Sequence, residues 1–184
     1  MTPAISFKQP VSVLVVVHTP ALQILLLERV FPPGFWQSIT GSLEAGETPA
    51  QAALREVAEE SGIVATAAQL EDWRLSNRFE IRPEWRHRYD PAVTHNVEHV
   101  FSLQVADGQA IRLAADEHRA LLWLPLDEAA EKVFSWTNRA AILQLRARLS
   151  CHEPTTTRGI QSREDSPEVG ADCTPSNDFR QSGQ

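Results

Sequence analysis

Runs of apolar residues, separated by proline, glycine and polar turns, divide the first 150 residues into short segments. Val11–His18 is a valine-rich run typical of a buried strand, and Thr19-Pro20-Ala21 separates it from a second strand at Gln23–Glu28. Proline and charged residues at Arg82–Val93 indicate a long loop. Further strands are predicted at Trp36–Thr40, Leu70–Leu75, Phe79–Ile81, Asn96–Val105 and Ala120–Leu124.

The clearest helix signal lies at Pro49–Ser61. Thr48 is a good N-cap, Gln51 completes a capping box with it, and Pro49 suits the first helical position. Gly62 is the expected C-terminal stop. The apolar stripe is predicted to comprise Ala53, Leu54, Val57 and Ala58, with the glutamates of this helix facing away from it.

Two further helices are predicted, at Asp127–Val133 and at Thr137–Leu149, where Ala141, Ile142 and Leu145 share the apolar face. Strands mixed with a few helices indicate an α/β fold, and residues 1–150 are expected to form one domain. Residues 151–184 are poor in large apolar side chains and rich in Ser, Thr, Pro and Gly, so we expect a disordered C-terminal tail.

Three carboxylates, Glu56, Glu59 and Glu60, fall on one turn of the predicted Pro49–Ser61 helix. Spacings of three and four residues bring side chains together, so these like charges repel unless a cation lies between them. Oxygen ligands favour hard ions, which predicts Mg²⁺, with Mn²⁺ as an alternative ion. The other interpretation is a solvated acidic face that binds nothing.

The acidic turn is part of a longer pattern with glycines, a loop glutamate and an arginine at fixed offsets. This pattern resembles the Nudix box, Gly-x5-Glu-x7-Arg-Glu-U-x-Glu-Glu-x-Gly-U, where U is a bulky aliphatic residue. Ser42 departs from the second glycine that many members carry. The resemblance implies an α/β/α sandwich with a mixed sheet and a Mg²⁺-dependent phosphoanhydride hydrolase (a diphosphatase). The matching residues are Gly41, Glu47, Arg55, Glu56, Val57, Glu59, Glu60, Gly62 and Ile63.

The resemblance also implies roles for individual residues. Glu56 and Glu60 are expected to hold the metal, together with Glu117 from a loop outside the box. The catalytic residues are expected to be Glu59, Glu47 and Arg55, and the general base is left open among Glu59, Glu47 and Glu117.

Segments outside the box bear on the substrate. Lys8–Ser12, Phe35–Ser42, Arg86–Tyr89 and Ser135–Arg139 resemble a bacterial Nudix subfamily that cleaves dihydroneopterin triphosphate to the monophosphate and pyrophosphate in folate biosynthesis. The alternatives are a general or house-cleaning (deoxy)nucleoside triphosphate pyrophosphatase and a non-catalytic Nudix domain that senses a nucleotide. The expected substrate-binding residues are the cations Lys8, Arg29, Arg86 and Arg88, for the phosphates, and Thr40 and Ser135, for the ring.

Net charge and hydropathy exclude some partners. The formal charge is −7 and no basic stripe is evident, which argues against nucleic acid as a partner and favours a small-molecule triphosphate. The apolar run at Val11–Val17 is too short to span a membrane and lacks the features of a signal peptide. We therefore expect a cytoplasmic protein without membrane contact, and the sequence leaves the oligomeric state open.

Overall fold

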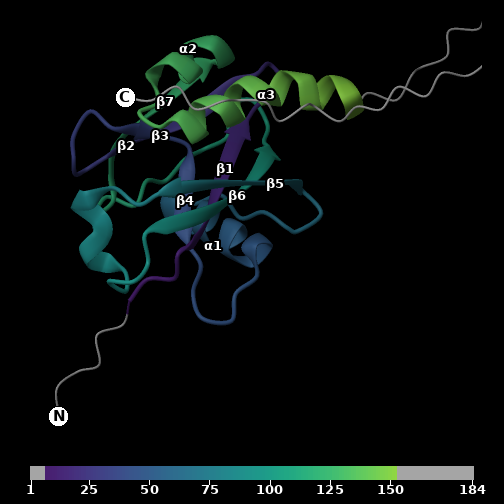
Figure 1. Ribbon diagram of the computed structural model, residues 1–184. Coiled ribbons are helices and arrows are strands. Elements are labelled where there is room, and N and C mark those ends of the chain that lie inside the picture. The colour runs from purple at the N-terminus through teal and green to yellow at the C-terminus, as the bar shows by residue number, and fades with distance from the viewer. Residues whose placement is uncertain (1–6, 153–184) are drawn as a thin grey trace, which may run out of the picture. The chain divides into compact units, whose positions relative to one another are not determined.

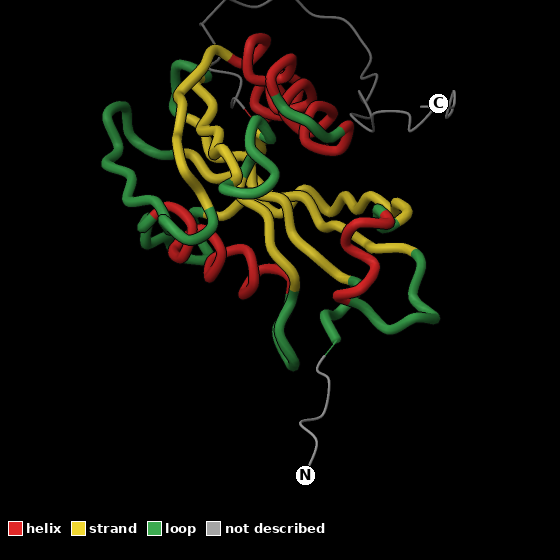
Figure 2. Tube along the Cα trace, turned by 90° about the vertical axis from the view of Figure 1, so that its left-hand side faces the viewer, coloured by secondary structure: helices red, strands yellow, loops and turns green. Residues whose placement is uncertain are grey.

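The computed structural model describes residues 7–152, which form a seven-stranded mixed sheet with helices on both faces (Figures 1 and 2). This arrangement confirms the α/β fold with a mixed sheet. The strands are β1 (Val11–His18), β2 (Gln23–Arg29), β3 (Trp36–Gln37), β4 (Ile39–Ser42), β5 (Leu70–Glu80), β6 (His95–Gln104) and β7 (His118–Pro125). The helices are α1 (Pro49–Ser61), the 3-10 helix η1 (Pro83–Arg88), α2 (Leu126–Lys132) and α3 (Trp136–His152).

Strand β1 lies at the centre of the sheet. It pairs in parallel with β6, whereas its partner on the other side changes along its length from β4 to β2. Strand β7 pairs with β2, so that Arg29 at the end of β2 lies opposite His118 at the start of β7. The start of β1, the end of β2 and the start of β7 therefore meet at one end of the sheet.

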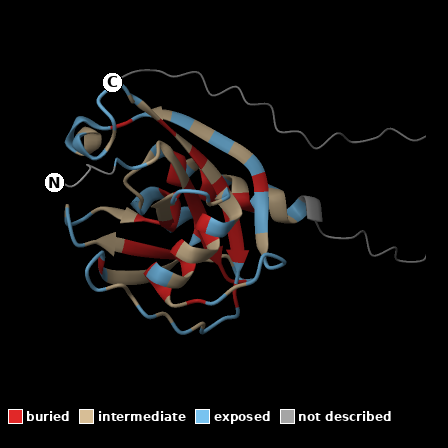
Figure 3. Ribbon diagram, turned by 90° about the horizontal axis from the view of Figure 1, so that it is seen from below, coloured by how far each residue is buried: buried red, intermediate tan, exposed pale blue. Residues whose placement is uncertain are grey.

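The hydrophobic core occupies both faces of β1. Val13, Val15 and Val17 pack with α1 in one cluster. Leu14 and Val16 are fully buried as well and, by the alternation of a strand, point to the face covered by α2 and α3. Buried residues concentrate in the central strands, as Figure 3 shows. The expected core face of α3, Ala141, Ile142 and Leu145, is buried.

Four predicted elements were wrong in detail. The strands predicted at Leu70–Leu75 and Phe79–Ile81 are one continuous strand, β5, which ends at Glu80, because the polar residues between them pair regularly with β6. The predicted loop after it contains the 3-10 helix η1. Trp36–Thr40 is divided, since Trp36 and Gln37 pair with β2 and Ile39–Ser42 pair with β1.

Contacts divide the chain into two units, Met1–Leu145 and Arg146–Gln184, and α3 crosses the boundary between them. All the residues expected to form the site belong to the first unit. The predicted tail falls almost wholly outside the described residues. No helix within residues 7–152 is long and apolar enough to cross a membrane.

Candidate active site

Helix α1 has the ends that its sequence predicts. The Thr48 side chain accepts a hydrogen bond from the Gln51 backbone, the Gln51 side chain accepts one from the Thr48 backbone, and Gly62 adopts φ 72° at the C-terminus. Gly62 therefore needs the left-handed conformation that glycine adopts without strain. These caps fix which residues of the helix face the sheet.

The acidic turn does not face away from the core as predicted. Glu56 is only 8% exposed and Glu60 only 2%, and both share the buried face with Ala53 and Val57, whereas Glu59 is exposed. The prediction was wrong because it assigned the sheet-facing side of α1 from the positions of its apolar residues alone. Two carboxylates held this deep need a positive partner, because burial disfavours their charge.

Gly41 on β4 makes room for one of them. A Cβ added at Gly41 would overlap the carboxylate of Glu56. The backbone of Gly41 has no positive φ, so the close approach of Glu56, and not a left-handed conformation, explains this glycine. Gly46, by contrast, has φ 84° as expected of a loop glycine.

Arg55 joins the box glutamates into one network. Its Nε donates to Oε1 of Glu47 at 2.7 Å, and its Nη1 donates to Glu56 at 2.8 Å and to Glu59 at 3.0 Å. Its Nη2 donates to the second oxygen of Glu47 and to the carbonyl oxygen of Ser42. The guanidinium thus fixes the helix to the loop and to β4 at the same time.

The same network separates the pKa values of the acids. The bond from Arg55 lowers the pKa of Glu47 to about 2. Burial raises the pKa of Glu56 to about 7, although Arg55 opposes the shift. Burial also raises the pKa of Glu60, against the opposing effect of His118. A cation bound beside Glu56 and Glu60 would lower their pKa values and so restore the charged carboxylates.

Glu60, Glu117 and His118 form a cluster that can hold a metal ion. Their ligand atoms lie within 4.8 Å of one another, and Nε2 of His118 is 3.1 Å from Oε2 of Glu60. These two buried atoms contact each other, and the hydrogen bond from His118 opposes the effect of burial on the pKa of Glu60. Buried carboxylate oxygens beside an imidazole nitrogen suit a divalent cation.

His118 is the site residue that sequence reasoning missed. It stands beside Glu117, which was proposed on its own. The available signal was the histidine next to Glu117 in the sequence, at the start of a strand. Neighbouring residues at the start of a strand lie at the same end of the sheet.

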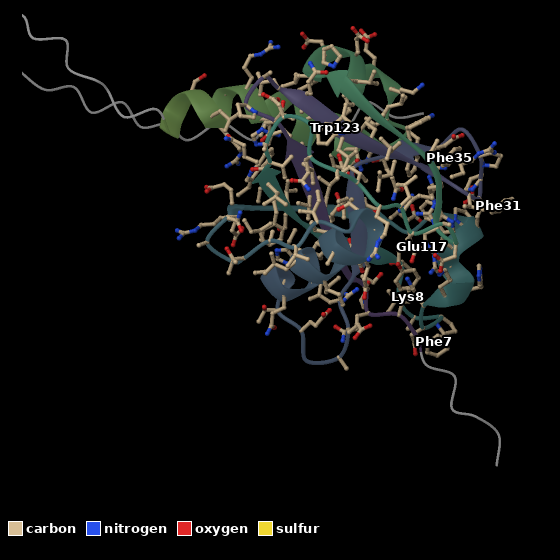
Figure 4. All side chains as sticks on the ribbon, turned by 180° about the vertical axis from the view of Figure 1, so that it is seen from behind. Phe7, Lys8, Phe31, Phe35, Glu117 and Trp123 are labelled. Atoms are coloured by element: carbon tan, nitrogen blue, oxygen red, sulfur yellow. The ribbon has the colours of Figure 1, made fainter. Side chains whose placement is uncertain are left out.

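Three of the predicted cations lie near these acids. Burial lowers the pKa of Lys8, as does Arg88, whereas Glu56 and Glu117 raise it; Figure 4 shows Lys8 and Glu117 close together. Arg29 acts electrostatically on both Lys8 and Glu60. Positive charge therefore gathers beside the acidic cluster, as binding of a polyphosphate would require.

The remaining predicted substrate residues have other contacts. Arg86 pairs with Glu80 at 2.8 Å, and no contact described for it reaches the acidic cluster. Thr40 accepts a hydrogen bond from the side chain of Gln37, whose own oxygen contacts Arg29. The hydroxyl of Ser135 caps α3 by accepting from the backbone and side chain of Asn138.

Comparisons with known proteins agree with this site. The family model of the NUDIX domain matches residues 8–145. The dihydroneopterin triphosphate diphosphatase of Escherichia coli K12 is 45% identical over 141 residues, which are 75% of this chain and 93% of the relative. The enzyme of that name from Haemophilus influenzae is 38% identical over 139 residues, 74% of this chain and 87% of the relative.

The solved structures agree with the sequence comparison. The structure of the E. coli dihydroneopterin triphosphate pyrophosphohydrolase has a TM-score of 0.71 and 44% identity to this chain, and the match covers 77% of this chain and 98% of that one. With the family model matching most of the chain, the protein belongs to the NUDIX hydrolase family.

Proposed function

We propose that this protein is a Mg²⁺-dependent pyrophosphohydrolase that converts dihydroneopterin triphosphate to dihydroneopterin monophosphate and pyrophosphate. The observation that carries the proposal is the 45% identity to the E. coli diphosphatase over 93% of that enzyme. The buried acids and the cations beside them support the reaction class independently.

Glu56, Glu60 and Glu117 are the residues proposed to hold the metal, and His118 adds one imidazole nitrogen to the cluster. A donor set dominated by carboxylates fits a hard divalent ion, and the imidazole keeps Mn²⁺ as an alternative. When bound, the ion would supply charge neutralisation and polarise a phosphoryl oxygen.

Lys8, Arg29 and Arg88 are proposed to bind the phosphates. A triphosphate carries several negative charges, and hydrolysis depends mainly on positioning and on stabilising charge at the transferred group. Burial lowers the pKa of Lys8 because it removes hydration from the ammonium, and a phosphate oxygen would replace that lost solvation.

Glu59 is our proposed general base. Glu47 has both oxygens bonded to Arg55 and a pKa of about 2, which makes it a weak proton acceptor. Glu59 is exposed and holds Arg55 through only one of its oxygens. Its other oxygen is free to orient a water molecule toward the phosphate, whereas Glu47 keeps Arg55 in place.

Identification of the products tests the reaction. We expect a phosphate assay on dihydroneopterin triphosphate with Mg²⁺ to give signal only after inorganic pyrophosphatase is added, because pyrophosphate is the first product. Phosphate release without that addition would show a phosphatase, and failure to turn over this substrate with either Mg²⁺ or Mn²⁺ would overturn the proposal.

A further inference from the structure

A row of polar side chains interrupts the apolar face of the sheet that α3 covers. Ser12, Asn77 and Glu98 occupy paired positions on β1, β5 and β6 and so point to the same face. Asn96 lies two residues before Glu98 on that face, and its amide donates to the hydroxyl of Ser12 at 2.6 Å. Asn96 and Glu98 are both buried.

Two side-chain oxygens in this row lack hydrogen-bond partners. Glu98 is 5% exposed and bonds to Thr137 and Asn77, yet its Oε2 atom has no hydrogen-bond partner. The side-chain oxygen of Asn96 is also buried without a partner. An unmade hydrogen bond at a buried oxygen is costly, so two such acceptors on one strand face suit a ligand with hydrogen-bond donors.

The row lies at the same end of the sheet as the acidic cluster. Ser12 pairs with Glu98 on one side and with Ser42 on the other, and Ser42 follows Gly41, which lies against Glu56. Two strand spacings separate Ser42 from Glu98, or roughly 10 Å. Glu56 belongs to the helix on one face of the sheet and Glu98 points to the other face. A substrate with its phosphates near Glu56 would therefore extend past the end of the sheet to bring its ring to Glu98.

An exposed aromatic residue adjoins a residue that bonds to this row. Trp136 opens α3 and is 60% exposed, and Thr137 after it bonds to Glu98. Phe134 stacks on Phe35 with 4.6 Å between ring centroids. An exposed tryptophan beside a buried acceptor suits a flat heteroaromatic ring, which needs a stacking surface and a polar edge contact.

We propose that Glu98, assisted by Asn96, accepts hydrogen bonds from the ring N–H and the exocyclic amino group of a 2-amino-4-oxopyrimidine edge, and thereby determines ring specificity. This inference rests on the proposed function for the identity of the substrate. The edge occurs in pterins and equally in guanine. Glu98 is nearly covered and bonds to Thr137, so ring contact requires the turn carrying Ser135 and Trp136 to move away from β6.

A pair of substrates that differ only in the exocyclic amino group tests its contact with Glu98 directly. GTP carries the amino group and ITP lacks it, so the GTP:ITP ratio of kcat/KM, or of competitive inhibition constants where turnover is slow, reports on that contact alone. We expect the wild-type protein to favour GTP by about 10- to 100-fold, the change expected when one hydrogen bond to a charged acceptor is lost. In Glu98→Gln the ratio should fall to within about threefold, because the amide presents a donor where an acceptor is needed.

Two further variants separate this role from a structural one. Glu131→Gln, on the exposed side of α2, removes the same charge and should leave the ratio unchanged. If Glu98→Gln does not fold, Glu98→Asp withdraws the carboxylate by one methylene and should lower the ratio in the same direction. A loss of stability without a change in the ratio would mean that Glu98 only anchors α3.

A wild-type ratio near one, or a ratio that Glu98→Gln and Glu98→Asp both leave intact, would overturn the inference. Neither result would touch the proposed function, because dihydroneopterin triphosphate is assayed separately. Conversely, a wild-type protein that distinguishes GTP from ITP through Glu98 but does not cleave the pterin substrate would contradict only the proposed function.

Discussion

Gly41 lies directly against the carboxylate of Glu56, so closely that a methyl group on Gly41 would overlap it. We therefore expect Gly41→Ala to displace Glu56 and to weaken metal binding and kcat by about 10- to 100-fold, as displaced ligands usually do. Titration of activity with Mg²⁺ measures both effects. Ser42→Ala, at the next position of β4 and pointing to the other face, is the matched control and should stay near wild type. Normal metal affinity in Gly41→Ala would show that Glu56 is not a ligand.

Replacing Glu60 should have opposite effects on stability and activity. Glu60→Gln removes a buried charge, so the metal-free protein should melt at a higher temperature than wild type in EDTA. The same change removes a proposed ligand, so most turnover and most stabilisation by added Mg²⁺ should disappear. Glu56→Gln should likewise lose most turnover. Melting curves with and without Mg²⁺ give both results, and a variant still stabilised like wild type by the ion would exclude Glu60 from the site.

Arg55 is expected to be irreplaceable by lysine. Its guanidinium reaches three carboxylates and one carbonyl oxygen at the same time, whereas a lysine ammonium has fewer donors and no planar geometry. Arg55→Lys should therefore lower kcat by about 10- to 100-fold, as loss of residues that orient ligands does, with a smaller effect on KM. Steady-state kinetics at saturating Mg²⁺ measure the two constants. A change confined to KM would indicate that Arg55 binds substrate instead of positioning the acids.

The stability of the metal-free protein should depend on pH through Glu98. Burial raises its pKa to about 7, whereas in the unfolded chain it titrates near 4.5. The folded state thus holds the proton more tightly, so the stability from this group is fully present below about pH 4.5 and is lost as pH rises to about 7. The change is on the order of 3 kcal/mol. Melting temperatures of wild type and Glu98→Gln, compared from pH 4.5 to 8.5 in EDTA, should converge at the acidic end and diverge at the basic end; parallel curves would contradict the assignment.

The sequence correctly predicted those helix and strand boundaries that depend on neighbouring residues. The ends of α1 agree with its sequence because Thr48, Gln51 and Gly62 act within a few residues of the backbone that they cap. The β1 and β2 boundaries agree to within one residue because continuous apolar runs have no other stable environment. Strand β5 was harder to predict, since it lies at the edge of the sheet and its exposed polar residues resemble a loop.

Features that depend on distant parts of the chain were not visible in the sequence. The inward position of Glu56 and Glu60 follows from the packing of α1 against β1 and β4, and hydrophobicity gave the opposite orientation. His118 reaches Glu60 because the segment before β7 bonds to the end of α1, through Ala114 to the Glu60 backbone, and these segments are far apart in sequence. The box motif identified the acids, but their geometry required the sheet.

The central claim is that this protein acts on a pterin triphosphate, and competition among substrates tests it most directly. The measurement is kcat/KM for dihydroneopterin triphosphate beside GTP, dATP and 8-oxo-dGTP, with the same enzyme and the same Mg²⁺ concentration. We predict that the pterin substrate exceeds every nucleotide, because the ring edge and the phosphates are then both bound. A purine nucleotide that is preferred by tenfold or more would contradict the claim and indicate a nucleoside triphosphate pyrophosphatase.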